Sequence, residues 1–350
     1  MTKITGFANS TFYAERAEEF LLDGPYGDPS VNDIVTVVPK INTQKQVVYV
    51  DRFDKVLLAD GGCGRIVGNT KAIEDREKLW TPKAMEAWIS ICGSDFDAKV
   101  INYQRALGLA SIEAPQLTAL VLDLLNDAIA KDLLRQAWFN DVQAEVYTSA
   151  GKLATADDKV HYNVYDGLFD QISAAITATT IKNIPISENA LSTTALQTAL
   201  AANKAYDTLM KMFKVADSRL RNDPNSLILM TNELFFNFME TLIARDVESS
   251  KVEIQNGFSM LKFYNHTIVN MDIWSRYIAS DFRADASSLY NPNRIVWAPK
   301  SELMLGVDVL PTNTIKTWVN YETEYVHAKA KFVADAKIGR EYLICTAGCE

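Results

Sequence analysis

SIEAPQLTALVLDLLNDAIAKDLLRQAWFNDVQAEVYTSAG, residues 111–151, is the stretch that decides the fold of this chain. Apolar residues recur in it with the period of a helix and form one stripe. The stripe consists of Leu117, Leu120, Val121, Leu124, Leu125, Ile129, Leu133, Trp138, Val142 and Val146. Ser111 can cap the start, Pro115 is tolerated in the first turn, and Gly151 is a natural stop. The pattern predicts one helix, roughly 55 Å long at ~1.5 Å per residue.

A helix of this length needs other elements to cover its apolar stripe. Few monomeric domains can cover so long a stripe alone. We therefore expect the helix either to serve as a spine for the rest of the chain or to span an interface between subunits. One long helix inside an ordinary α+β enzyme is the alternative that the pattern leaves open.

The composition is that of a globular protein. The 350 residues are 48% hydrophobic and 23% charged, which excludes a disordered chain and is enough for two or three compact modules. The formal net charge is −9, whereas a dedicated nucleic-acid binder normally carries a basic surface. A shell that only encloses nucleic acid remains compatible with this charge. No apolar run is long enough to span a bilayer and no signal core opens the chain, so we expect a cytosolic product without a targeting segment.

The residues before the helix predict an arm and an extended loop. Residues 1–34 end in DGPYGDPS, which breaks a short amphipathic pattern and is typical of an arm that packs on something else. Two strand-like runs, IVTVV and QVVYVDRF, follow within 34–58. The glycines of 61–68 fit neither the dinucleotide-binding nor the Walker spacing, so they indicate a flexible loop. With the dense charges of 70–83, the range 45–105 predicts a two-stranded excursion with a charged tip, which needs a partner to lie on.

The residues after the helix predict a mixed module followed by long strands. Residues 165–304 include the buried-strand pattern SLILM, the helix NELFFNFMETLIARD, and further strands in MLKFYN, TIVNMDIW and NRIVWAP. One long strand is predicted within 314–337, with Trp318 on one face and Tyr325 and His327 on the other. The predicted fold class is α+β.

The titratable residues do not form a recognisable catalytic or metal site. The chain has three histidines and four cysteines, namely His161, His266, His327, Cys63, Cys92, Cys345 and Cys349. Neither His266 nor His327 has a Ser or Cys nearby in a nucleophile context, and the cysteines have no zinc-type spacing. Cys345 and Cys349 could form a redox pair, although two unreactive thiols are the favoured interpretation.

Two carboxylate pairs are also interpreted as solvated surface charge. They are Asp157 with Asp158, and Glu322 with Glu324, and neither pair lies beside a His, an Arg or a glycine cradle. No basic run is interleaved with aromatic residues, as a single-strand nucleic-acid site would require. We therefore assign no catalytic, cofactor-binding or metal-binding residues, and an enzyme becomes the weaker hypothesis.

The order of these elements resembles the major capsid protein of tailed double-stranded-DNA bacteriophages, which has the Hong Kong 97-like fold. YDGLFDQI at 165–172 resembles the short Gly-Leu-bearing segment that opens the axial domain of that family. SLILMTNELFFNFMETL, GFSMLKFYNHTIVNMDIW and NRIVWAPKSELMLGV resemble the strand–helix–hairpin–strand run that follows it. The resemblance implies five parts, namely an N-terminal arm (1–44), an extended loop (45–105), a peripheral domain with the spine helix (106–164), an axial domain (165–304) and return strands of the peripheral domain (305–350).

The resemblance implies a structural shell subunit and not an enzyme. Such a subunit self-assembles as hexamers and pentamers into the icosahedral capsid that encloses a phage double-stranded DNA genome. The DNA is packaged without sequence-specific binding, no membrane is involved, and a portal protein is a further partner. The implied location is the virion, with assembly in the host bacterial cytoplasm. Intersubunit contacts are expected at the extended-loop tip, at Arg65, Lys71, Glu74, Asp75, Arg76, Glu77, Lys78 and Trp80.

The sequence departs from some members of the family. The arm begins at Met1 with no scaffolding region before it, so a separate scaffolding protein, or none, is expected. The loop carries Lys71, Lys78 and Lys83, but no Asn and Glu can be matched to the Lys–Asn cross-link of some relatives, so this chemistry is not carried over. A bacterial nanocompartment shell of the encapsulin type, with the same fold and a protein cargo, is the alternative. A cytosolic α+β enzyme without a recognisable site is the less favoured one.

Overall fold

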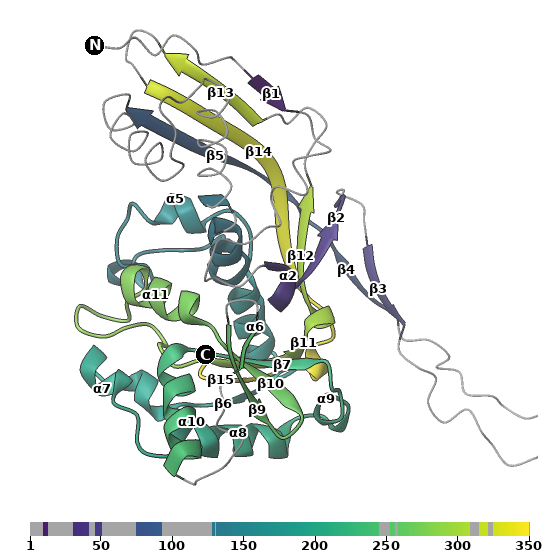
Figure 1. Ribbon diagram of the computed structural model, residues 1–350, viewed down its shortest axis with the longest axis vertical. Helices are drawn as coiled ribbons and strands as arrows, with labels where there is room; N and C mark the ends of the chain where they lie inside the picture. Colours follow the sequence, from purple (N-terminus) through teal and green to yellow (C-terminus); the bar gives the residue numbers. More distant parts are fainter. Residues whose placement is uncertain are drawn as a thin grey trace, which may run out of the picture.

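The computed structural model combines helices and β-sheets in an α+β arrangement, as predicted (Figure 1). It describes residues 10–12, 31–41, 46–50, 75–92, 128–129, 131–244, 253–255, 258–308, 315–320 and 325–349. Within these ranges, none of the helices has the length and apolar character needed to cross a bilayer.

The described part of the predicted spine is a helix over residues 131–139, with 128–129 also helical. Three members of the apolar stripe, Ile129, Leu133 and Trp138, are at most 2% exposed, so this part of the stripe was predicted correctly. Of the two later members, Val142 is 45% exposed and Val146 is partly buried against the core, and both lie beyond the helix. The earlier members fall within 101–127, outside the described residues.

The spine helix ends at residue 139. The sequence had predicted that it ends at Gly151, and that prediction is wrong. The two residues that follow form backbone hydrogen bonds with other segments. Gly167 N donates to Asn140 O over 2.7 Å, and Asp141 N donates to Tyr162 O over 2.9 Å. These tertiary bonds replace the next helical bonds, so the chain turns away although its apolar period continues.

A seven-stranded sheet forms the lower half of the molecule in Figure 1. Its strands, in order across the sheet, are β6 (Lys182–Ile184), β15 (Cys345–Ala347), β11 (Ile295–Pro299), β7 (Ser226–Met230), β10 (His266–Asn270), β9 (Phe258–Phe263) and β8 (Glu253–Gln255). The pairs β7–β10 and β6–β15 are parallel, and the other neighbours are antiparallel.

Helices cover both faces of this sheet. Ile228 and Met230 pack with α8 (Lys204–Val215) and α10 (Asn232–Ala244). Leu229 points to the opposite face, towards the cluster that contains α6 (Leu168–Thr177), α11 (Asp272–Asp281) and the spine helix. The helix α11 begins inside a segment predicted as a strand.

Shorter helices are α2 (Val31–Ile34), α5 (Lys159–Tyr162), α7 (Thr194–Thr198), α9 (Ser218–Arg221), and the 3-10 turns η2 (Tyr147–Ser149), η3 (Ser187–Ala190), η5 (Lys300–Glu302) and η6 (Glu341–Leu343).

A six-stranded sheet forms the upper half of the view in Figure 1. It consists of β1 (Ser10–Phe12), β13 (Ile315–Asn320), β14 (Tyr325–Ile338), β12 (Leu303–Asp308) and β2 (Thr36–Pro39), with β5 (Lys83–Cys92) also paired to β14. One face of β14 is buried through Ala328, Ala330, Phe332, Ala334 and Ala336. These residues belong to the same core cluster as Leu133 and Trp138, and α6 contacts β14 through Gln171, whose Nε2 donates to Ala336 O over 2.7 Å.

The long strand predicted within 314–337 is two strands, and the predicted faces are wrong. The strands β13 and β14 run antiparallel, and Trp318 lies directly opposite His327. Because directly opposed residues share a face of a sheet, Trp318 and His327 project to the same side.

A separate two-stranded sheet joins β3 (Gln46–Val50) to β4 (Asp75–Leu79) in antiparallel register. The strand β3 was predicted, whereas the residues of β4 were expected in the charged tip. The sheets do not follow the domain limits drawn from the sequence. The strand β5 lies within 45–105 but belongs to the six-stranded sheet, and β15 lies within 305–350 but belongs to the seven-stranded sheet. The five-part division therefore remains a proposal.

Candidate functional site

The base of the β3–β4 hairpin is fixed to the six-stranded sheet by Trp80. This side chain is 2% exposed and packs against Ile41 and Met304, with Gly306 of β12 close to its ring. Trp80 was predicted as an intersubunit contact at the loop tip, and that prediction is wrong. A buried indole at the hairpin base belongs to the interior of its own subunit.

Polar contacts on both sides of Trp80 hold the same base. Lys78 Nζ donates to Glu341 Oε1 over 2.9 Å. Thr81 N donates to Asp335 Oδ2 over 2.7 Å, and Lys337 Nζ lies 3.4 Å from the same oxygen. Burial raises the pKa of Asp335, while the Thr81 amide and the Lys337 ammonium oppose that rise. The hairpin therefore projects from an anchored base (Figure 1).

The remaining predicted tip residues are only partly placed. Arg65, Lys71 and Glu74 lie outside the described residues. Asp75, Arg76 and Glu77 lie in β4, where their backbones pair with Val50, Tyr49 and Val48. Lys78 is half-buried and ion-paired within its own chain, as described above. Their contact with a neighbouring subunit remains a proposal.

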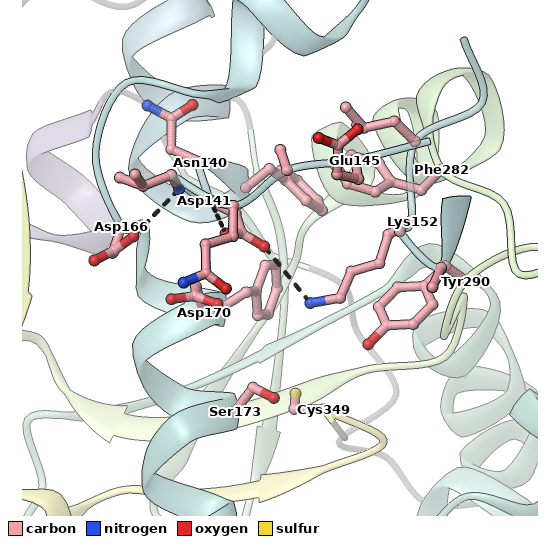
Figure 2. A pocket seen from close by; sticks show the side chains of 18 of the residues that line it. Asn140, Asp141, Glu145, Lys152, Asp166, Asp170, Ser173, Phe282, Tyr290 and Cys349 are labelled. Atoms are coloured by element: carbon pink, nitrogen blue, oxygen red, sulfur yellow. Dashed lines mark hydrogen bonds and ion pairs between the residues drawn. The ribbon is translucent and has the colours of Figure 1, made fainter. Parts of the chain in front are cut away.

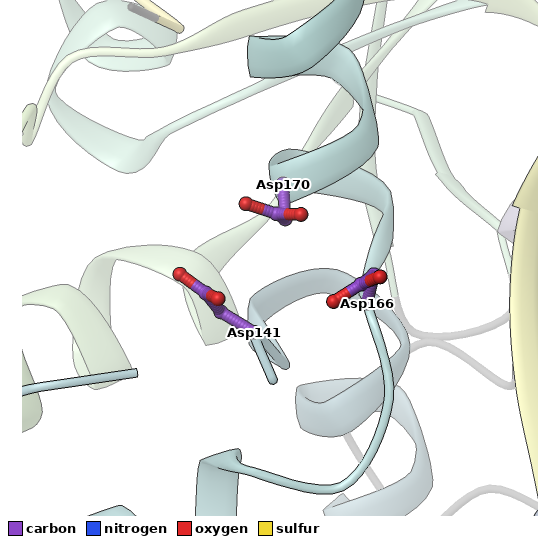
Figure 3. Close-up of side chains that lie close together, drawn as sticks. All are labelled: Asp141, Asp166 and Asp170. Atoms are coloured by element: carbon purple, nitrogen blue, oxygen red, sulfur yellow. The ribbon is translucent and has the colours of Figure 1, made fainter. Parts of the chain in front are cut away.

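A cavity of about 540 Å³ lies between the segment after the spine helix and the start of α6 (Figure 2). Three of its carboxylates, from Asp141, Asp166 and Asp170, approach within 4.8 Å of one another (Figure 3). The sequence did not indicate this group, because Asp141 is far from the other two along the chain. Three carboxylates at this spacing are a ligand type that divalent cations accept.

Local structure already accounts for these acids. Asp141 Oδ1 accepts from Gln143 N over 2.7 Å, and Asp166 Oδ1 accepts from Val142 N over 3.2 Å. Asp170 lies in the first turn of α6, where the helix dipole favours an acidic side chain. Burial and the neighbouring Asp141 and Asp166 raise the pKa of Asp170 to about 6. Asp141 and Asp166 therefore hold the turn after the spine helix, and by itself the group does not establish a metal site.

A buried histidine has a serine partner that sequence reasoning missed. His266 Nδ1 lies 2.7 Å from Ser226 Oγ, because the parallel strands β7 and β10 start side by side. His266 Nε2 lies 3.1 Å from Arg221 O, which places the ring hydrogen on Nε2, and Ser226 Oγ also donates to Asp223 O over 2.9 Å. Trp297 Nε1 donates to Ser226 Oγ over 3.0 Å.

The pair is not arranged as a nucleophile and a base that a substrate could reach. Ser226 is 1% exposed and His266 is 2% exposed. Burial lowers the pKa of His266, which keeps the imidazole neutral. The hydrogen bonds therefore satisfy polar groups inside the seven-stranded sheet.

Three strands bring aromatic and charged residues together on the face of the six-stranded sheet that points away from the buried core. This aromatic face comprises Trp88 and Glu86 of β5, Trp318 of β13, and Tyr325, His327, Lys329 and Lys331 of β14. The ring centroids of Trp88 and Trp318 are 6.0 Å apart, and those of Trp318 and His327 are 5.1 Å apart. Lys329 Nζ lies 4.7 Å from the centre of the Trp88 ring. Sequence reasoning missed the group because its members come from separate strands.

Neither protein-family models nor curated protein sequences match the chain. Solved structures do. A chain in the structure of the satellite phage P4 procapsid including size determination (Sid) protein matches with a TM-score of 0.53 and 8% identity, over 90% of this chain and 92% of that chain. The capsid of the cyanophage P-SCSP1u matches with a TM-score of 0.50 and 12% identity, over 99% and 92%. The capsid of a native GTA particle matches with a TM-score of 0.50 and 10% identity, over 91% and 88%.

At these identities the likeness concerns the fold. The matches cover nine tenths or more of this chain. The chain has the fold of these capsid chains, and the Hong Kong 97-like capsid fold implied by the sequence is confirmed.

Proposed function

We propose that this chain is the structural shell subunit of a bacteriophage capsid and not an enzyme. The observation that carries the proposal is the fold, which is shared with capsid chains over 90–99% of this chain. The net charge of −9 supports a coat that encloses DNA without gripping it tightly.

The β3–β4 hairpin supports the proposal physically. Its base is fixed by Trp80, Lys78 and Thr81, whereas its strands pair only with each other among the described strands. A two-stranded hairpin is marginally stable by itself in water. A neighbouring subunit would cover it, and we propose that Arg65, Lys71, Glu74, Asp75, Arg76, Glu77 and Lys78 contribute to that contact.

The further partners are part of the same proposal. A shell of this kind would consist of hexamers and pentamers of this chain. Its further partners would be a portal protein, a separate scaffolding protein and the packaged double-stranded DNA. The subunit would assemble in the host bacterial cytoplasm and remain in the virion.

Electron microscopy of the purified, expressed chain tests the function. We expect capsomers or closed shells, because obligate assemblies bury large subunit surfaces. Light scattering that detects only monomer over a wide concentration range contradicts the proposal. Particles of uniform small size that contain protein cargo, without DNA, would favour the nanocompartment alternative instead.

A further inference from the structure

We propose that the aromatic face binds a second copy of this chain, with Trp88 at the centre of the contact. The inference rests on the proposed shell function and names a surface that this function would use. It depends on the exposure of the face, its charge and the unpaired edge beside it.

Trp88 is far more exposed than most of the other tryptophans of the chain. Trp88 is 55% exposed, whereas Trp80, Trp138, Trp274 and Trp297 are at most 2% exposed. Its ring is held by Trp318, by Lys329 and by His327, whose Nδ1 lies 3.5 Å from Trp88 Nε1. A large ring that is already fixed loses little conformational freedom on binding, which is the property of an interface hot spot.

The area of the face suits a protein partner. Each aromatic side chain has about 150–250 Å² to bury, and four of them share this face. Trp88 and Tyr325 are 55% and 38% exposed, so at about 150–250 Å² for each side chain they leave roughly 140–230 Å² open, compared with about 800 Å² per partner in a standard interface. The rings would therefore form the core of such an interface, with charged residues at its rim.

The charges favour another copy of this chain over nucleic acid. Lys329 and Lys331 lie 2.7 Å and 4.0 Å from the single carboxylate of Glu86, so the group is locally positive. The chain as a whole carries a net charge of −9, so a second copy presents a surface that is acidic on balance. The two lysines already share the Glu86 carboxylate and the chain as a whole is acidic, so little positive charge is left for the dense charge of a phosphate backbone.

The strand that carries Trp88 also has a free edge among the described strands. The ten residues of β5 pair with β14 along one side, from Lys83 opposite Ala334 to Cys92 opposite Tyr325. No other described strand pairs with β5. An edge of this length offers backbone donors and acceptors next to the aromatic face, and a strand of a second copy can use them.

Oxidative footprinting of the tryptophans, read by mass spectrometry of the wild-type chain, tests the inference directly. Dissociated subunits are compared with shells assembled without nucleic acid. We expect Trp88 to be oxidised several-fold more slowly in the shells, while the four buried tryptophans stay protected in both samples. Equal oxidation of Trp88 in the two samples overturns the inference although the shell function stands. Protection that appears only after DNA is added also overturns it, and failure to form any particle overturns both proposals.

A pair of variants gives an independent measurement. Trp88→Ser should stay folded, because most of the ring lies outside the core, and should raise the lowest protein concentration that gives shells by about tenfold or more. Val160→Ser, at a 76% exposed apolar residue of α5, is the matched control and should assemble at the wild-type concentration. A Trp88→Ser chain that assembles as readily as wild type contradicts the inference. If circular dichroism shows that this variant is unfolded, the footprint decides.

Discussion

The ring of Trp80 occupies the space in which a side chain at Gly306 would begin. A Cβ atom placed on Gly306 would lie 2.8 Å from Trp80 Cζ3 and 2.7 Å from Ile41 Cγ2. Distances below 3.0 Å force neighbouring atoms to move, so strand β12 needs a glycine at this position. The contact joins the base of the β3–β4 hairpin to the six-stranded sheet without spare room.

Gly306→Ala should therefore destabilise the chain by about 1–3 kcal/mol, the usual cost of adding a methyl group to a filled core. Urea denaturation followed by circular dichroism measures the change. The double variant Gly306→Ala, Trp80→Leu should lose less stability than the sum of its single variants, because the smaller side chain leaves room for the methyl group. Additive losses would show that the two residues are not in contact.

Replacing residues 61–74 with a short Gly-Ser turn should block assembly without unfolding the subunit. The replacement leaves β4, Trp80 and the polar contacts of Lys78 and Thr81 in place, so the melting temperature should stay near that of wild type. Static light scattering should show only monomers or small oligomers. Shells that form as readily as those of wild type would mean that the loop tip is not an intersubunit contact.

His266 should make the subunit less stable in acid. Burial lowers the pKa of this imidazole in the folded state, so the unfolded chain takes up the proton first as the pH falls below about 6.5. The free energy of unfolding should decrease from there until the pH reaches the folded-state pKa. Urea midpoints at pH 8 and pH 5 test this, and His266→Gln should lose less stability between them. Equal losses would show that His266 does not contribute to the pH dependence.

Asp170 should act in the opposite direction. Its pKa is raised to about 6 in the folded state, so the folded chain holds a proton that the unfolded chain releases. Stability from this group increases as the pH falls from above 6 towards 4. Asp170→Asn should be more stable than wild type at pH 8, by no more than about 1 kcal/mol because solvent screens this half-exposed carboxyl, and the difference should vanish near pH 4. A less stable variant at pH 8 would mean that the α6 dipole outweighs the repulsion.

The local pattern of apolar residues was enough to predict the elements that bury one regular face. The buried positions of Leu133 and Trp138 follow from the helical period, and the strand β3 follows from its β-branched run. The end of the spine helix could not be predicted in this way. It depends on Gly167 and Tyr162, which are more than 20 residues further along the chain and compete for the backbone groups after residue 139.

The candidate surfaces show the same limit. Trp80 was expected at an exposed tip because its neighbours in sequence are charged, yet Ile41 and Gly306 form its environment. Trp88 and Trp318 are brought together only by the pairing of β5 and β13 with β14. Such a register depends on contacts between distant segments, which the sequence period does not encode.

The position of β15 has a consequence for synthesis on the ribosome. Residues 345–347 lie between β6, which starts at Lys182, and β11, so they complete the interior of the seven-stranded sheet. A nascent chain that has not yet emerged to residue 347 lacks the strand that links these two neighbours. This half of the subunit can reach its final form only after residue 347 has left the ribosome, long after its neighbour β6 has been synthesised.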